Sequence, residues 1–280
     1  MTTGTVAVTG MNATAGGFSV VGNPYQAQVD MNKVLVTNAT AVNLASFYYV
    51  VDPKLGGKGD YATVDLVTPG NSTAVDANQY LQPGQACFVK TVNASAASLN
   101  FTETDKYDGT QKSVFRTKNV AAARLLLTLA DASANALDRL VVAFDASETN
   151  DVNQNDASKL TNFDESMASS NNGKLLSIEK RAIPTDTDEI PLNITKYRGT
   201  SYTINAEGSG LTGSTPYLLD QYTSKTTEIP LEGSVNYAYT VDVAIPASIA
   251  ADRFKLIYAK SLKTIDNELA GFALYPNPSQ

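Results

Sequence analysis

Short apolar runs bounded by turn-forming residues recur along the whole chain, and they restrict what it can fold into. The runs are rich in β-branched and aromatic side chains, and Gly, Asn, Asp and Pro stand between them. A typical helix needs ten or more residues, so runs this short favour strands. Ten such runs lie at residues 18–21, 47–51, 86–90, 124–129, 140–144, 175–178, 201–204, 217–219, 237–241 and 254–258.

The turns and the side-chain alternation agree with strands. Asn172-Gly173 precedes one run and suits a type I′ hairpin. Residues Phe254, Leu256 and Tyr258 would share one face of a half-buried strand. The best helical candidate, residues 119–138, contains an uninterrupted apolar stretch that favours a buried strand, followed by a turn at 131–135.

The spacing of the runs predicts an all-β protein with little helix, built as one or two antiparallel β-sandwich or jelly-roll units. A polar, turn-prone segment at residues 105–112 indicates a boundary. We therefore expect one sandwich module over residues 1–118 and a second over 119–260. A single large sandwich with shared sheets remains an alternative.

Missing residue types exclude several kinds of chemistry. The 280 residues include no His and a single Cys, Cys87. Without His there is no Ser-His-Asp triad and no His-ligated zinc or iron. One Cys excludes an internal disulfide and a cysteine-ligated cluster. Carboxylate chemistry, oxygen-ligated cations, binding of carbohydrate or protein, and a structural role remain.

Charge and hydropathy limit the partners. The formal net charge is −7, and no cluster of Lys and Arg is present, so we expect no nucleic acid partner. No apolar run approaches the roughly 18 residues that cross a bilayer, so we expect no membrane span. The residues after Met1 lack the features of a signal peptide. Met1 is then a native start or the start of a fragment with an upstream signal.

The last residues carry the most informative motif. After a polar stretch at 261–267 come Leu274, Tyr275, Pro276, Asn277 and Pro278, a stiff segment that cannot continue a central strand. It resembles the opening of the type A C-terminal sorting domain of type IX secretion substrates in the Bacteroidota. The resemblance implies that residues 261–280 are a linker and the first residues of a sorting domain. It also implies the type IX secretion machinery as a partner, and a secreted or cell-surface location.

A second resemblance covers nearly the whole chain. Gly22-Asn23-Pro24-Tyr25, the aromatic run ending in Asp52-Pro53, and Pro83-Gly84-Gln85 resemble a module found upstream of the sorting domain in adhesin-like proteins of these bacteria. Two later motifs, Tyr217 to Asp220 and Asp252-Arg253-Phe254, recur in similar proteins at comparable positions.

The chain departs from this module at two places. Gln26 stands where a second Pro is usual, and Ala86-Cys87 stands where Gly-Phe is usual. Cys87 thus occupies a core position, which favours a packed, unreactive thiol.

An Asp/Asn-rich stretch after the run at 140–144 is the one candidate metal site. The side chains at Asp151, Asn153 and Asn155 have the spacing of the first ligands of a calcium loop. No Gly or Glu follows at the positions that an EF-hand requires, and a polar turn explains the same residues. The hypothesis is that Asp151, Asn153 and Asp156 bind calcium, the one possible cofactor.

Catalysis and sugar stacking have weaker support. Glycoside hydrolysis needs two carboxylates about 5–9.5 Å apart, and the candidate pairs are Asp52 with Asp60 and Asp186 with Glu189. Nothing distinguishes them from solubilising charges, so we expect no enzymatic activity. An exposed cluster of Tyr48, Tyr49 and Tyr61 could stack on sugars, but core packing is the usual role of such rings.

The sequence therefore predicts a non-enzymatic structural or adhesin-like module of a type IX-secreted surface protein. It would contact surface glycans or other surface proteins. A carbohydrate-binding β-sandwich is the alternative. A phage or virus-like surface protein is a second alternative, which the C-terminal motif argues against.

Overall fold

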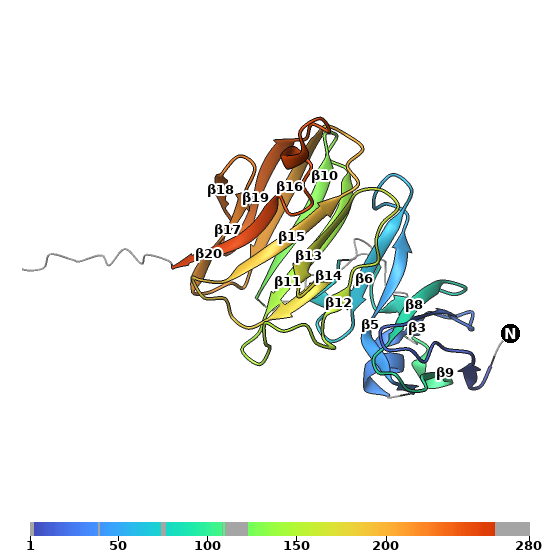
Figure 1. Ribbon diagram of the computed structural model, residues 1–280. Coiled ribbons are helices and arrows are strands. Elements are labelled where there is room, and N and C mark those ends of the chain that lie inside the picture. The colour runs from blue at the N-terminus through green and yellow to red at the C-terminus, as the bar shows by residue number, and fades with distance from the viewer. Residues whose placement is uncertain (1–2, 39, 74–76, 108, 110–122, 261–280) are drawn as a thin grey trace, which may run out of the picture.

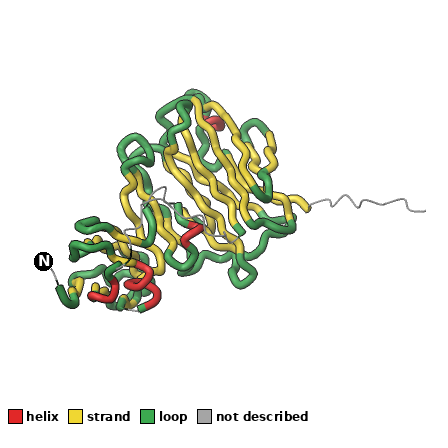
Figure 2. The backbone as a smooth tube through the Cα atoms, turned by 180° about the vertical axis from the view of Figure 1, so that it is seen from behind, coloured by secondary structure: helices red, strands yellow, loops and turns green. Residues whose placement is uncertain are grey.

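The computed structural model describes residues 3–38, 40–73, 77–107, 109 and 123–260, which form two β-rich halves (Figure 1). We call the described residues up to 109 the N-terminal half and those from 123 the C-terminal half. Helical segments are short, as the red segments of Figure 2 show. They are η1 (Lys33–Thr37), η2 (Pro69–Asn71), η3 (Glu103–Asp105) and η4 (Pro246–Ser248).

The C-terminal half is one 11-stranded sheet. Its order is β18-β17-β20-β15-β13-β14-β11-β10-β16-β19, and β12 pairs with β14 beside this path. The pair β11 and β14 is parallel, and the other pairs are antiparallel. The strands are β10 (Arg124–Asp131), β11 (Ala136–Phe144), β12 (Ala157–Ser158), β13 (Ser166–Asn171), β14 (Lys174–Arg181), β15 (Glu189–Thr195), β16 (Ser201–Ser209), β17 (Ser214–Asp220), β18 (Lys225–Glu228), β19 (Gly233–Thr240) and β20 (Phe254–Lys260).

A large hydrophobic core lies inside this half. It joins side chains of β10, β11, β16 and β19 to side chains of β15, β17 and β20, so the sheet bends over and its two parts face each other. Leu125, Leu127 and Leu129 of β10 all point into this core, as the two-residue period of a strand requires.

The N-terminal half consists of three small sheets around a second core. Their orders are β2-β8-β5-β6, β1-β9-β4 and β3-β7. The strands are β1 (Val6–Val8), β2 (Phe18–Gly22), β3 (Val29–Asp30), β4 (Ala41–Val42), β5 (Leu44–Asp52), β6 (Asp60–Asp65), β7 (Tyr80–Leu81), β8 (Ala86–Thr91) and β9 (Ser98–Phe101). Every strand pair described lies within one half.

A third core, which we call the joint, packs the two halves against each other. β5 contributes alternate residues to it and its other residues to the N-terminal core, and β10 and β11 likewise serve both the joint and the C-terminal core. These strands are therefore buried on both faces. The buried members of the joint are Ala45, Phe47, Tyr49, Leu126, Val141, Ala143, Ala157 and Ile178.

The structure confirms the all-β prediction. All ten apolar runs coincide with strands, with only Val241 falling one residue beyond its strand, and residues 124–131 form β10 rather than a helix. Asn172 and Gly173 have φ values of 48° and 75° in the β13–β14 hairpin, as a type I′ turn needs. Phe254, Leu256 and Tyr258 are all buried in the C-terminal core.

Two predictions concern residues outside the described ranges. The boundary between residues 118 and 119 lies there, so the division into modules 1–118 and 119–260 stays a prediction. The segment 261–280, with the motif from Leu274 to Pro278, lies there as well. Within the described ranges, no helix has the length and hydropathy that crossing a membrane requires.

The joint makes a specific prediction for stability. Val141 is fully buried, but only because the N-terminal half covers the outer face of β11. Val141→Ala should lower the free energy of unfolding by about 2 kcal/mol, from lost burial and the cavity left behind. Urea unfolding would measure the change. The control is Val51→Ala on β5, whose side chain is 54% exposed and should cost little. Equal effects of the two substitutions would contradict the packing of the halves.

Candidate functional site

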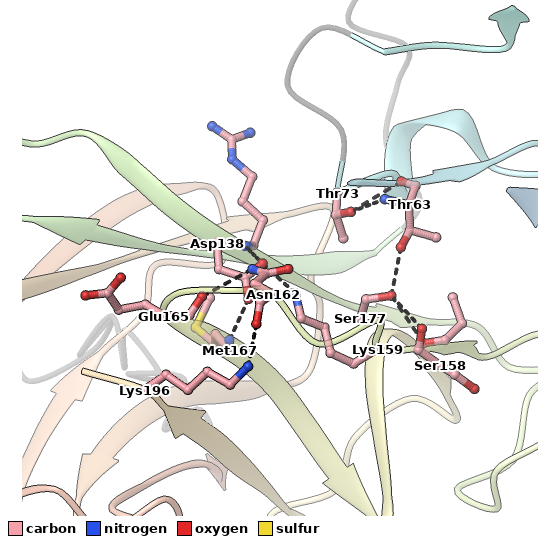
Figure 3. Close-up of polar contacts among 12 residues, drawn as sticks. Thr63, Thr73, Asp138, Ser158, Lys159, Asn162, Glu165, Met167, Ser177 and Lys196 are labelled. Carbon is pink, nitrogen blue, oxygen red and sulfur yellow. Dashed lines mark hydrogen bonds and ion pairs between the residues drawn. The ribbon is translucent and has the colours of Figure 1, made fainter. Parts of the chain in front are cut away.

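Polar groups that bond across the two halves surround the joint. The Thr63 and Ser177 hydroxyls are 2.8 Å apart (Figure 3). The Tyr49 hydroxyl donates to the carbonyl of Ser158. Lys180 Nζ lies 2.8 Å from Asp65 Oδ2. Because these groups are largely buried, each bond compensates for water that was removed. The seam between the halves is therefore a buried polar region to consider as a site.

A buried ion pair lies at the centre of this seam. Lys159 Nζ is 2.6 Å from Asp138 Oδ1, and both side chains are about 1–2% exposed. The Met167 backbone N–H donates to the other oxygen of Asp138, as Figure 3 shows. Lys196 extends toward Asn162 and donates to its carbonyl oxygen. The charges are thus paired and hydrogen-bonded, which indicates a role in holding loops together rather than in chemistry.

Asp60 is the carboxylate with the most perturbed environment. It is 3% exposed, and its Oδ2 makes no hydrogen bond. Burial raises its pKa to about 7, and the charges of Asp138 and Asp164 raise it too, whereas Lys159 and a hydrogen bond from the Phe163 backbone oppose the shift. Asp60 therefore retains a proton over a pH range in which an exposed carboxyl ionises.

Two neighbouring acids are compensated by a single arginine. Arg198 bonds to Glu165 through its backbone N–H and its guanidinium, and its Nη1 lies 2.9 Å from Asp164 Oδ2. Burial raises the pKa of Glu165, but hydrogen bonds from Tyr202 and Arg198 outweigh it and hold that pKa below its usual range. Among the described residues, no group of three or more His, Cys, Asp or Glu side chains could hold a metal ion.

The structure brings one predicted carboxylate pair together and gives the members of the other different surroundings. Asp52 and Asp60 are opposite each other on β5 and β6, and both are buried. Asp52 Oδ1 accepts the Lys54 backbone N–H, which closes a turn. Glu189 forms an ion pair with Lys255, while Asp186 is exposed on a loop. Neither arrangement is the open two-carboxylate cleft of a glycosidase, and the absence of enzymatic activity stays a prediction.

The predicted calcium ligands lie in one loop, but the side-chain oxygens of two of them accept hydrogen bonds from the backbone. Asp156 is buried, and its two oxygens accept the backbone N–H groups of Asn153 and Lys180. Asn153 Oδ1 accepts the backbone N–H of Asn155, and Asp151 is exposed. The loop is therefore held by its own hydrogen bonds. Calcium binding by Asp151, Asn153 and Asp156 stays a prediction.

The expected core packing of the tyrosines holds for Tyr48 and Tyr49, so they form no exposed cluster. Tyr48 is 1% exposed and Tyr49 is fully buried, because the joint and the N-terminal core cover both faces of β5. Tyr61 packs edge-on against Phe88. The prediction for Cys87 is correct, since the residue is buried and burial raises its thiol pKa to about 12.

Two motifs that carry the adhesin-like resemblance meet in space. The guanidinium of Arg253 makes two hydrogen bonds to the carboxylate of Asp220, at 2.9 and 2.7 Å, and both side chains are at most 2% exposed. Burial alone would raise the pKa of Asp220, but hydrogen bonds from Arg253 and Tyr237 hold it below its usual range. Asn23 similarly bonds the carbonyl oxygens of Ala27 and Leu81. These motif residues hold the fold together.

A cavity of about 680 Å³ opens at one end of the seam, and no sequence motif indicated it. Two lysines, Lys90 and Lys174, line it, with the amides of the loop at 153–155. The lysines are far apart in sequence and come from different halves. Only the packing of β8 beside β12 and β14 brings them together, so no spacing could have revealed the pair. We call this cavity the lysine pocket.

The perturbed pKa of Asp60 predicts a pH effect. An exposed Asp has a pKa of about 4, so between about pH 4 and 7 the folded chain keeps a proton that the unfolded chain releases. This group therefore lowers the free energy of unfolding as pH rises through that window. Asp60→Asn should remove the contribution, so the variant should gain stability relative to wild type from pH 4 to 7. Urea unfolding at several pH values checks this, with Asp186→Asn as the control for losing one charge.

The Asp220–Arg253 pair predicts a large loss of stability when one partner is removed. Arg253→Met leaves a buried, unpaired carboxylate and should cost about 3–5 kcal/mol. Lys255→Met is the matched control, because Lys255 is two residues after Arg253 and forms a more exposed ion pair with Glu189. Breaking this pair should cost about 1 kcal/mol or less. Thermal and urea unfolding would compare them. Similar costs would show that burial of the Asp220–Arg253 pair does not matter.

Comparison with known proteins gives a family but no function. No curated protein and no solved structure matches the chain significantly. A family profile described as "Domain of unknown function (DUF8693)" matches residues 1–258. The match covers nearly the whole chain, including both halves of the fold, and the chain therefore belongs to this family.

Proposed function

We propose that this chain is a non-enzymatic, adhesin-like structural module of a bacterial surface protein exported by type IX secretion. The observation that carries the proposal is that the motif side chains are buried and bonded to other parts of the protein. Asp220, Arg253 and Asn23 are buried and bonded within the protein, and Asp138 at the seam is paired with Lys159. Removing one partner of such a buried pair is strongly destabilising, so these side chains serve the fold.

The C-terminal motif supports the export part of the proposal. Tyr275-Pro276-Asn277-Pro278 resembles the start of a type A sorting domain, which would make the type IX machinery the partner and the cell surface the location. A disulfide-free chain suits this proposal, because its stability comes from sheet packing in three cores.

Carbohydrate binding is the second candidate. The tyrosine cluster does not support it, since Tyr48 and Tyr49 are buried. The lysine pocket favours it, because a concave surface lined by amides and ammonium groups offers hydrogen bonds to sugar hydroxyls and anionic groups.

Export can be tested in the full gene of the source bacterium. Replacing Tyr275, Pro276, Asn277 and Pro278 with alanine should abolish surface display, because the predicted recognition segment is lost while residues 1–260 are untouched. Protease digestion of intact cells, followed by immunoblotting, measures display. Alanine replacement of the neighbouring residues 262–265 is the matched control and should leave display unchanged. Undiminished display of the motif variant would reject the secretion proposal.

A further inference from the structure

The lysine pocket lies between the two halves and is built by both. One wall comes from the N-terminal half, with Ala45, Phe47 and Lys90, and the other from the loop at 152–155 with Ser158 and Lys174. Its volume of about 680 Å³ is within the range of small-molecule sites, roughly 300–1,000 Å³. A short oligosaccharide would fit a cavity of this size.

The charge of the pocket is opposite to that of the protein. The chain has a net charge of −7, yet Lys90 and Lys174 line the pocket and no Asp or Glu does. Two carboxylates lie close by without lining the pocket, and both accept hydrogen bonds from its loop. Glu148 accepts the side-chain amide of Asn155, and both oxygens of Asp156 accept backbone N–H groups. The charged side chains that line the pocket are therefore both positive, in a protein that is acidic overall.

The position of Lys90 is fixed. Its Nζ donates to Ser158 Oγ at 2.7 Å and lies 5.9 Å from the ring centre of Phe47. Within the described ranges, neither Lys90 nor Lys174 forms an ion pair with a carboxylate. Burial lowers the pKa of Lys90, and the charge of Lys174 lowers it further, while Asp156 opposes the shift. An anion between the two ammonium groups would relieve this repulsion.

Neutral hydrogen-bonding groups surround the two charges. The side-chain amides of Asn93 and Gln154 line the pocket, and in the described structure neither is engaged in a hydrogen bond with another residue. Each amide can both donate and accept. Sugar hydroxyls have the same dual character, so these amides suit a saccharide better than a simple inorganic anion.

We propose that the lysine pocket binds an acidic saccharide, with its carboxylate or sulfate group between Lys90 and Lys174 and its hydroxyls on the surrounding amides. This inference deepens the carbohydrate-binding candidate and does not depend on export. The two proposals can therefore fail separately, since binding is measured on purified protein and display on intact cells.

Isothermal titration calorimetry on the full chain tests the inference with trigalacturonic acid as the acidic probe and maltotriose as the neutral one. Trigalacturonic acid should bind, and maltotriose should bind at least tenfold more weakly. Lys174→Gln should weaken binding of the acidic probe about tenfold, because a charge-assisted hydrogen bond is lost. Lys174 is exposed, so this variant should retain its fold. Lys90→Gln should have a similar effect, with its fold checked by thermal unfolding.

Lys225→Gln is the control for a change of net charge. Lys225 is also an exposed lysine, but it lies on β18, an edge strand of the large sheet and away from β14 (Figure 1). The Lys225→Gln variant should bind trigalacturonic acid as tightly as wild type. No binding at millimolar concentration would overturn the inference, as would equal binding of maltotriose. Equal losses in Lys174→Gln and Lys225→Gln would overturn it too, because they would indicate attraction by overall charge rather than a site.

Discussion

The joint between the two halves is the interaction on which the rest of the structure depends. Strands β5, β10 and β11 have apolar side chains on both faces, and each face meets a different core. If the halves separated, Phe47, Tyr49 and Val141 would be exposed to water, at a cost of roughly 25 cal/mol for each Å² of apolar surface. The joint therefore makes the two halves, which share no described strand pair, into one packed unit.

Burying the joint also determines the chemistry of the seam around it. Polar side chains at its margin lose water and must find partners, as Thr63 does in Ser177 and Asp138 does in Lys159. Asp60 is buried with one carboxyl oxygen that has no hydrogen-bond partner, and burial raises its pKa. A perturbed carboxylate can mark an active site, but here the perturbation follows from the burial of Asp60 between the packed strands. Asp220 and Arg253 are paired with each other in a buried position, which indicates a structural role.

Much of the fold could be predicted because strands leave a local signal. Runs such as 124–129 and 254–258 show it clearly, whereas β13 does not, since Ser166–Asn171 is composed mainly of small and polar residues. It is nevertheless central in the sheet, between β14 and β15. A sequence also cannot distinguish a strand that faces one core from a strand that faces two, and for this reason exposure of Tyr48 and Tyr49 had remained an open alternative. The candidate site was not predictable, because Lys90 and Lys174 become neighbours only through the joint.

The place of the lysine pocket at the end of the joint has a physical consequence. The apolar contact continues from Phe47 to Ala45, and small residues at Ala15 and Gly16 leave the space beyond it unfilled. A ligand in this space contacts Lys90 from one half and Lys174 from the other. Such a ligand binds the packed arrangement and not the separated halves, so it stabilises that arrangement by an amount that grows with the ratio of ligand concentration to Kd. In a surface module, occupancy of the pocket would therefore strengthen the contact that holds the whole fold together.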